Sequence, residues 1–252
     1  MRKNDIFRRD VLLALTLLTR LPLPHLPPHA FQRQARAVWA FPLAGLTVAL
    51  PAALLAWLAL ALDLPAAVAA GLALTVQVLL SGAMHEDGLA DTADGLWGGS
   101  DRARRLEIMK DSRIGAYGVI ALILSFGLRW TALAALLPLT GSWVLLALAM
   151  MSRAAMPPLM AALPNARGEG LSRRVGRPPA LTCGLGVLLA LALSLPLIGA
   201  AAIGTAMGMA AAALGLGVLA KAKIGGQTGD ILGASQLLAE IAGLLTLLAV
   251  FG

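Results

Sequence analysis

Long apolar stretches, each about the length of a membrane-spanning helix, recur through most of this 252-residue chain. A helix needs about 20 predominantly apolar residues to cross the hydrocarbon core of a bilayer. Charged residues make up only 13% of the chain and no polar face accompanies the apolar stretches, which argues against a soluble helical protein. The sequence predicts an all-α, polytopic membrane bundle that forms a single domain, 1–252. We expect about seven transmembrane helices, near 38–62, 66–84, 116–138, 143–163, 180–198, 201–220 and 231–251.

Two parts of this layout allow an alternative. Residues 180–220 could hold one span and a re-entrant piece, which would lower the count to six. Residues 1–37 precede the first span and contain an apolar stretch, Val11 to Leu18, that is too short to cross a bilayer comfortably. Because no small-residue cleavage site follows this stretch, we expect no cleavable signal. The short N-terminal segment is expected to lie in the membrane interface or to pack against the bundle.

The basic residues indicate how the bundle is oriented. Apart from Arg129 and Arg153, every Lys and Arg lies in connections that seven spans would place on one side of the membrane. This asymmetry predicts that these connections face the cytoplasm of a bacterium, with the protein in its inner membrane. The net charge of +7 is then mainly an orientation signal that also favours anionic membrane lipid as a partner, and it is poor evidence for nucleic acid. The basic connections are 1–37, 85–115, 164–179 and 221–230.

The segment from His85 to Gly95 concentrates four carboxylates in nine residues of an otherwise apolar chain. On a helix, the spacing of Asp87, Asp91 and Asp94 places all three side chains on one face. Like charges there repel one another unless cations bridge them or some are protonated. Mg²⁺ is held by carboxylates and usually shares its coordination shell with substrate phosphates. We therefore predict a metal site on this face; Glu86 points away from it and is expected to be a neighbour.

A second group of polar residues follows this segment. Three glycines after Asp94 are expected to break the helix, and a short helix over 101–110 would return Asp111 and Arg113 to the membrane face. Asp111 is predicted to be a fourth metal ligand, and Arg113 to clamp a phosphate through two hydrogen bonds. The alternative is a solvated, charged loop between two spans.

The segment Gly225–Asp230 is the third polar group. Backbone amides in a glycine-rich turn can approach a phosphate, so Gly226, Gln227, Thr228 and Asp230 are predicted to bind substrate. Asp230 could also bind the metal. The alternative is a turn whose final aspartate caps the next helix.

Two arginines and one histidine are predicted near or inside the membrane. Arg153 could reach toward the aspartates or a substrate phosphate, whereas Arg129 could snorkel or pair within the bundle. The imidazole of His85 could accept a proton near neutral pH or could simply pack. The candidates for a catalytic base are His85, Asp94 and Asp111.

Taken in order, these segments resemble the cobalamin synthase family, the adenosylcobinamide-GDP ribazoletransferases. The resemblance rests on 85–95 together with 106–115 and 225–230, and it extends from Thr19-Arg20-Leu21-Pro22 to Glu240, so it covers essentially the whole chain. The family pattern usually has an apolar residue at Glu86 and often a Cys at Ala93. Neither departure removes an aspartate that we assign to the metal.

The resemblance implies the last assembly step of the corrinoid nucleotide loop. Adenosylcobinamide-GDP would react with α-ribazole, or its 5′-phosphate, to give adenosylcobalamin, or its 5′-phosphate, and GMP, with Mg²⁺ as the cofactor. Phosphoryl transfer needs charge neutralisation and in-line positioning more than a covalent nucleophile. Mg²⁺ on Asp87, Asp91, Asp94 and Asp111 would bridge the diphosphate, while Arg113 and Arg153 would neutralise the remaining oxygens.

Two other classes of membrane protein share some of these features. A CDP-alcohol phosphotransferase that makes phospholipids also carries an aspartate cluster, but its Asp-Gly-x-x-Ala-Arg signature fails here because Asp91 interrupts it. A transporter would line its path with intramembrane carboxylates, and of the acidic residues only Glu240 is predicted well inside a span.

Overall fold

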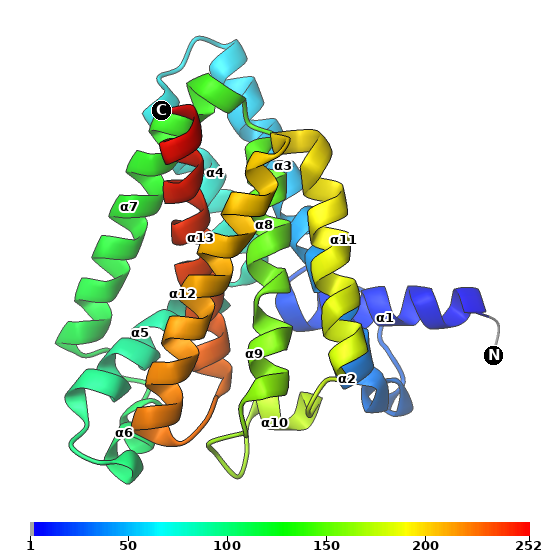
Figure 1. Ribbon diagram of the computed structural model, residues 1–252, viewed down its shortest axis with the longest axis vertical. Coiled ribbons are helices and arrows are strands. Elements are labelled where there is room, and N and C mark those ends of the chain that lie inside the picture. Colours follow the sequence, from blue (N-terminus) through cyan, green and yellow to red (C-terminus); the bar gives the residue numbers. More distant parts are fainter. Residues whose placement is uncertain (1–2) are drawn as a thin grey trace.

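A computed structural model describes residues 3–252; Met1 and Arg2, the start of the predicted interfacial segment, lie outside the described residues. The described chain is helical, and in place of strands it contains a single isolated β-bridge. The helices form an elongated bundle, with α1 lying across its lower part (Figure 1). Their bounds are α1 Lys3–Leu18, η1 Pro28–Arg33, α2 Gln34–Ala37, η2 Val38–Ala40, α3 Phe41–Ala61, α4 Ala66–Ser81, α5 Met84–Gly98, α6 Arg102–Ile108, α7 Ala116–Thr140, α8 Val144–Ala154, α9 Met156–Ala162, α10 Leu171–Val175, α11 Ala180–Ile198, α12 Ala201–Ile224 and α13 Gly229–Phe251.

The predicted polytopic bundle is confirmed. Among residues 3–252, six helical segments are long and apolar enough to cross a membrane, and a seventh crossing exists if the bent pair α4–α5 counts as one span. The predicted division of 180–220 into two helices is also confirmed, by α11 and α12. The predicted span 66–84 is different, because α4 ends at Ser81 and the chain then bends by 87° into α5. The six segments are Pro28–Ala61, α7, α8 with α9, α11, α12 and α13.

The corner between α4 and α5 sets the direction of the acidic helix. Gly82 and Ala83 both have left-handed backbone angles, with φ of 65° and 55°. A Cβ atom on Gly82 would lie 2.5 Å from Cγ of Arg20, and the backbone N–H of Arg20 donates to the carbonyl of Leu80 at 2.7 Å. The left-handed backbone therefore favours glycine at 82, and the Arg20 side chain packs into the space that a Cβ atom would fill.

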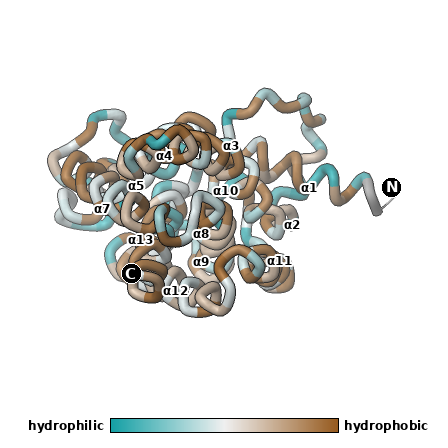
Figure 2. The backbone as a smooth tube through the Cα atoms, turned by 90° about the horizontal axis from the view of Figure 1, so that it is seen from above, coloured by the Kyte–Doolittle hydropathy of each residue, from teal (hydrophilic) through white to brown (hydrophobic). Residues whose placement is uncertain are grey.

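Helix α8 lies at the centre of the bundle. All of its residues are buried, and the view from above shows the other long helices around it (Figure 2). It packs on α3, where Ala49, Ala52, Ala53 and Ala56 are fully buried. Such small residues let helix backbones approach closely, which is how membrane helices gain packing energy. Large apolar side chains such as Ile123, Leu188 and Val218 are exposed on the outer helices, as expected of a surface that contacts lipid.

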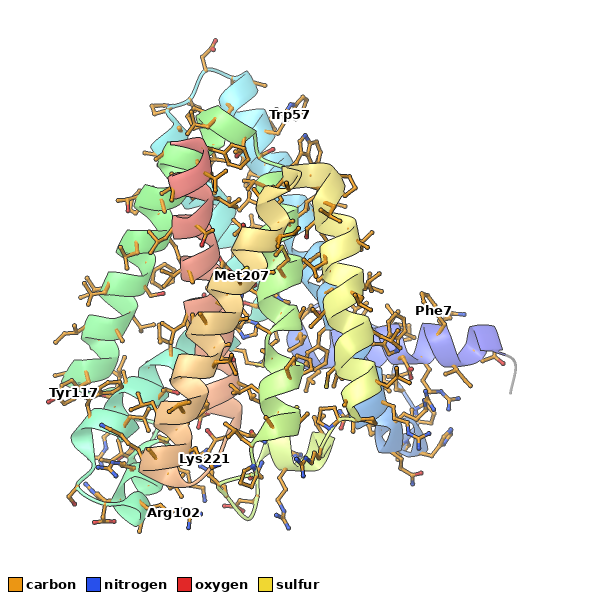
Figure 3. The ribbon with its side chains drawn as sticks, in the orientation of Figure 1. Phe7, Trp57, Arg102, Tyr117, Met207 and Lys221 are labelled. Carbon is orange, nitrogen blue, oxygen red and sulfur yellow. The ribbon has the colours of Figure 1, made fainter. Side chains whose placement is uncertain are left out.

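The N-terminal helix is fixed to the bundle by a buried carboxylate. Asp10 is 3% exposed and accepts hydrogen bonds from Arg33 Nε and Nη2, both at 3.0 Å, and from Trp39 Nε1 at 3.1 Å. Leu13 of this helix is buried, whereas Phe7 is exposed toward its outer end (Figure 3). A helix that lies across the bundle with one buried face suits the interfacial segment expected from the sequence.

The polar loops gather at one end of the bundle. Arg102, Tyr117 and Lys221 lie at this end, and Trp57 lies at the other (Figure 3). Helix α3 rises from the polar end and α7 begins there again, so the chain returns between them through α4 and α5 (Figure 1). The acidic helix α5 is thereby placed among the polar loops.

Candidate active site

Helix α5 carries the three predicted aspartates on one continuous helix. Asp87 is exposed, Asp91 is half-buried and Asp94 is buried, so the acidic face runs from the surface into the bundle. The predicted end of the helix after Asp94 is confirmed at Gly98, with Gly99 as the C-cap, whereas Gly95 lies within the helix and does not break it. Gly95 lets the following segment pack closely on α5. A Cβ atom at this position would lie 2.1 Å from Cγ of Met109 and 3.0 Å from the carbonyl oxygen of Arg105.

Asp94 ties α5 to the start of α7. Its Oδ2 accepts a hydrogen bond from the backbone N–H of Gly115 at 2.7 Å, and its Oδ1 accepts one from Gly118 at 2.9 Å. A Cβ atom on either glycine would lie 2.4 Å from a carboxylate oxygen of Asp94. A carboxylate at a helix N-terminus is stabilised both by these amides and by the helix dipole. The predicted metal role of Asp94 stays a prediction, and the structure gives this residue a structural role.

Asp111 and Arg113 pair with each other. The short helix expected here forms as α6, capped by Asp101, which accepts a hydrogen bond from the N–H of Arg104 at 3.0 Å. Arg113 Nη2 donates to Asp111 Oδ2 at 2.8 Å, and its hydrogen bonds lower the pKa of Asp111. The structure therefore does not bring Asp111 into the ligand set of Asp87 and Asp91.

The fourth carboxylate near the acidic face comes instead from α13. Asp87 and Asp230 line one pocket of about 150 Å³, together with Arg167. Arg167 Nη1 lies 2.9 Å from Asp230 Oδ2. The charges that act on Asp91 are those of Asp230, Asp87, Arg167 and Asp94, in that order. Three separate segments thus meet at one acidic site.

Arg167 has unused donors. Within residues 3–252, its Nε and Nη2 atoms are buried and have no hydrogen-bond partner. Buried donors are rarely left unpaired, because each costs about 1–3 kcal/mol. Arg167, which lines the pocket, therefore has two donor nitrogens that the fold leaves unpaired, whereas Arg113 is exposed and pairs with Asp111.

The Gly225–Asp230 turn is built against the loop that carries Arg167. The backbone of Asn165 bridges that of Gln227, with Ala166 N donating to Gln227 O and Gln227 N donating to Pro164 O, both at 2.8 Å. A Cβ atom on Gly226 would lie 2.1 Å from the Pro164 carbonyl oxygen. The glycine is therefore needed for this close approach, and the bridge carries Arg167 to Asp230.

Side chains of the turn complete the connection. The Ser172 hydroxyl donates to Gln227 Oε1 at 2.5 Å, and the Thr228 hydroxyl accepts from the N–H of Ile231 at 3.3 Å, capping α13. The predicted substrate-binding residues Gly226, Gln227 and Thr228 thus position the turn in this structure. Their binding role stays a prediction.

Gly88 permits the contact between α5 and α13 on which the site depends. A Cβ atom at this position would lie 2.9 Å from the carbonyl oxygen of Asp230 and 3.3 Å from Cα of Gly233. The two helices therefore cross at paired glycines, one residue after Asp87.

Gly88→Ala is expected to separate these helices and to lower turnover on the order of 10- to 100-fold, because a displacement of about 1 Å at a reacting centre can cost that much. Steady-state rates of the reconstituted protein measure the effect. Gly127→Ala is the matched control, since a Cβ atom there meets nothing within 4 Å. Unchanged turnover in Gly88→Ala would contradict the proposed role of the crossing.

A buried ion triad anchors the other face of α5. Arg129 donates to Glu86 Oε1 and to Glu240 Oε1, each at 3.0 Å, and all three side chains are buried. Gln236 Nε2 extends the network by donating to Glu240 Oε2 at 2.8 Å and to the Ser152 hydroxyl at 2.9 Å. The prediction that Arg129 pairs within the bundle is confirmed. Glu86 is a structural neighbour of the acidic face, as expected.

Arg153 and His85 lie deep in the bundle. Arg153 is 2% exposed, its Nη1 donates to the carbonyl of Ala149 at 3.2 Å, and the carboxylates that act on it are Glu240 and Glu86. The structure does not bring it to the aspartates. His85 is also 2% exposed, which places it behind the acidic face.

The donor chemistry of the pocket fits a hard cation that arrives with its substrate. Within residues 3–252, no three His, Cys, Asp or Glu side chains converge closely enough to hold a metal ion by themselves. Asp87 and Asp91, one turn apart on α5, nevertheless offer oxygen ligands beside Arg167 and Asp230. Mg²⁺ commonly takes one or two carboxylates and completes its shell with water and substrate phosphates.

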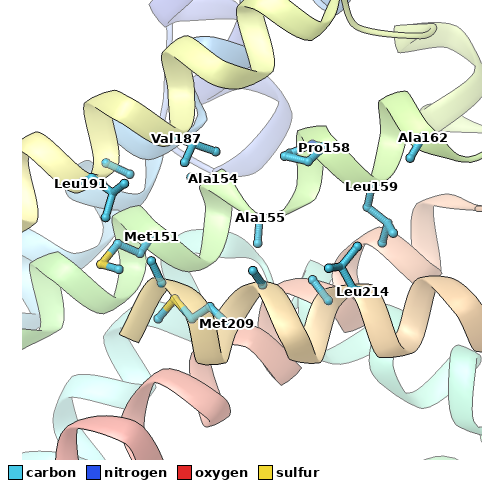
Figure 4. A pocket seen from close by; sticks show the side chains of 14 residues that line it. Met151, Ala154, Ala155, Pro158, Leu159, Ala162, Val187, Leu191, Met209 and Leu214 are labelled. Atoms are coloured by element: carbon cyan, nitrogen blue, oxygen red, sulfur yellow. The ribbon is translucent and has the colours of Figure 1, made fainter. Parts of the chain in front are cut away.

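A second pocket is larger but chemically different. It measures about 340 Å³ and lies between α8, α9, α11 and α12 (Figure 4). All of its lining residues are Ala, Leu, Met, Pro or Val, among them Met151, Pro158 and Met209. Such a lining offers no group for acid, base or metal chemistry, so the smaller acidic pocket is the candidate active site.

Fold and site together define a polytopic helical membrane protein with an acidic, arginine-containing pocket at one end of its bundle. The chain belongs to the cobalamin-5-phosphate synthase family, whose model matches residues 10–248. This membership decides against the phospholipid synthase and transporter alternatives.

Curated relatives from several bacteria agree with the family. Adenosylcobinamide-GDP ribazoletransferase from Bradyrhizobium diazoefficiens is 48% identical over 94% of this chain and 92% of its own length. Proteins of the same name from Sinorhizobium medicae and Rhizobium meliloti are each 47% identical, covering 94% and 92% of this chain and 94% and 93% of their own lengths. No solved structure matches the chain.

Proposed function

We propose that this protein joins adenosylcobinamide-GDP to α-ribazole, or to its 5′-phosphate, and releases GMP in a Mg²⁺-assisted phosphoryl transfer. The observation that carries this proposal is the 47–48% identity, over nearly the full length of both chains, with relatives named for that activity. The product is adenosylcobalamin, or its 5′-phosphate, with a completed nucleotide loop.

The pocket provides what this transfer needs. Asp87 and Asp91 would hold the Mg²⁺ ion, which when bound neutralises charge on the diphosphate. Arg167 lines the pocket and is already paired with Asp230, and its two unpaired donor nitrogens would donate to phosphate oxygens once a substrate enters. The ion pair between them orients the guanidinium, so less conformational freedom is lost when a phosphate binds.

The same pocket would lie on the cytoplasmic side of the inner membrane. It lies at the end of the bundle that carries Arg102 and Lys221, among the basic connections. Basic loops are retained on the cytoplasmic side during insertion. Their surplus charge would also attract anionic lipid headgroups near the pocket.

The test is turnover by the purified protein reconstituted in lipid. With adenosylcobinamide-GDP, α-ribazole and Mg²⁺ we expect equal amounts of adenosylcobalamin and GMP, and chelation of the divalent ion should abolish both. Omitting α-ribazole is the matched control and should give no GMP. Release of GMP without α-ribazole would indicate a hydrolase, and absence of product from correctly inserted protein with any divalent ion would contradict the proposal.

A further inference from the structure

A narrow apolar slot adjoins the acidic pocket. Its volume is about 60 Å³, and it shares four lining residues with the acidic pocket, so the two pockets are direct neighbours. The shared residues are Met84, Leu171, Ser172 and Gly229. Most of the other walls are apolar side chains from α1, α3, α9 and α13, including Leu17, Leu18, Phe41, Met156, Met160 and Leu232.

One buried polar side chain in this slot has no use in the fold. His85 lines the slot, and neither of its ring nitrogens has a hydrogen-bond partner within residues 3–252. An imidazole carries at least one N–H donor in either charge state. Leaving that donor buried and unpaired costs about 1–3 kcal/mol, so an unpaired histidine in an apolar slot indicates a ligand with one matching acceptor.

We infer that this slot receives the aromatic base of the ribazole substrate, with the His85 N–H donating to the unsubstituted ring nitrogen of the base. This inference rests on the proposed function. A benzimidazole is a flat, mostly apolar bicycle whose second nitrogen bears the ribose, and it therefore offers one acceptor. The ribose would then extend through the shared residues toward Asp87 and Arg167.

The other groups of the two substrates fit this slot less well. Guanine carries several donors and acceptors on its edges, and the slot has too few polar side chains to pair them. At about 60 Å³ the slot must widen to admit a bicyclic base, and a corrin ring is far too large for any such local widening. The slot can adapt to a planar ring, because Met84, Met156 and Met160 are flexible side chains that repack around different shapes.

Narrowing the slot should select against bulk on the base. Met160→Phe is expected to raise KM for ribazole carrying a dimethylbenzimidazole by about tenfold more than KM for ribazole carrying unsubstituted benzimidazole, since extra methyl groups in a fitted pocket are worth that much. KM for adenosylcobinamide-GDP should not change. Met207→Phe is the matched control, because Met207 is 69% exposed on the outer surface of α12. An equal effect on both ribazoles, or no effect, would overturn the inference.

A second variant tests the hydrogen bond itself. His85→Phe keeps a flat ring and removes the donor, so KM for both ribazoles should rise by about tenfold while KM for adenosylcobinamide-GDP stays constant. A change confined to adenosylcobinamide-GDP, or unchanged KM values, would overturn the role of His85. Wild-type turnover in the same preparation distinguishes a failure of the proposed function from a failure of the slot assignment. If the wild type shows no turnover, the proposed function is contradicted. If it does, the variants test only the assignment of the slot.

Discussion

Asp91→Asn is expected to lower turnover by about 100- to 1,000-fold, the effect of removing a preorganised electrostatic group from an active site. Asp91 is half-buried between Asp87 and Asp230, so a cation bound there is stabilised by charges that an amide no longer supplies. Because Asn has nearly the same shape, the fold should be retained. The measurement is the rate of adenosylcobalamin formation over a range of Mg²⁺ concentrations.

The matched control for this variant is Asp63→Asn. Asp63 is exposed in the turn between α3 and α4, at the far end of the bundle, and its positive φ of 57° is one that Asn also adopts readily. Its turnover should equal that of the wild type. Full activity in Asp91→Asn would keep the proposed reaction and remove Asp91 from the metal site.

Arg129→Met is expected to destabilise the protein by about 3–5 kcal/mol, because it leaves Glu86 and Glu240 as buried carboxylates without a cation. The change is measured by thermal unfolding of the detergent-solubilised protein, with the remaining fraction of monodisperse protein as the readout. A triple variant, Glu86→Gln with Arg129→Met and Glu240→Gln, should recover most of the stability, since replacing a whole buried ion group by uncharged residues is often close to neutral.

Arg104→Met provides the comparison with an exposed ion pair. Arg104 bonds to Glu107 at 2.8 Å, but both side chains are more than half exposed, so the expected loss is below about 1 kcal/mol. If Arg129→Met were as stable as Arg104→Met, the triad would not be the anchor of α5 that its geometry indicates.

The transmembrane layout could be predicted from the sequence because it depends on local composition. The apolar stretch 180–198 coincides with α11, and the others agree to within a few residues. The bend after Ser81 could not be predicted in the same way, since it depends on two left-handed residues and on the contact of Arg20 with Gly82. A hydropathy pattern carries no information about that contact.

The site was predictable where it follows helical periodicity and not where it depends on loops. Asp87 and Asp91 share a face because they are four residues apart on one helix. Asp111 was expected in the same ligand set, but Arg113, two residues away, competes for it. Arg167 was not assigned to the site from the sequence. Its meeting with Asp230 depends on a backbone bridge between distant segments, and the polar, glycine-rich character of 165–170 is only a weak signal for such a meeting.

The position of α13 in the chain has a consequence for biogenesis. This helix, which is synthesised after α5 and α7, supplies both Asp230 of the pocket and Glu240, one of the two acidic partners of Arg129. Until α13 inserts, the pocket lacks one wall. Arg129, which is already in the bilayer, then has only Glu86 to neutralise it and lacks Glu240. Completion of the acidic pocket and neutralisation of the buried arginine therefore depend on the same event, the insertion of α13, and a chain that lacks this helix carries an unbalanced charge in the membrane core.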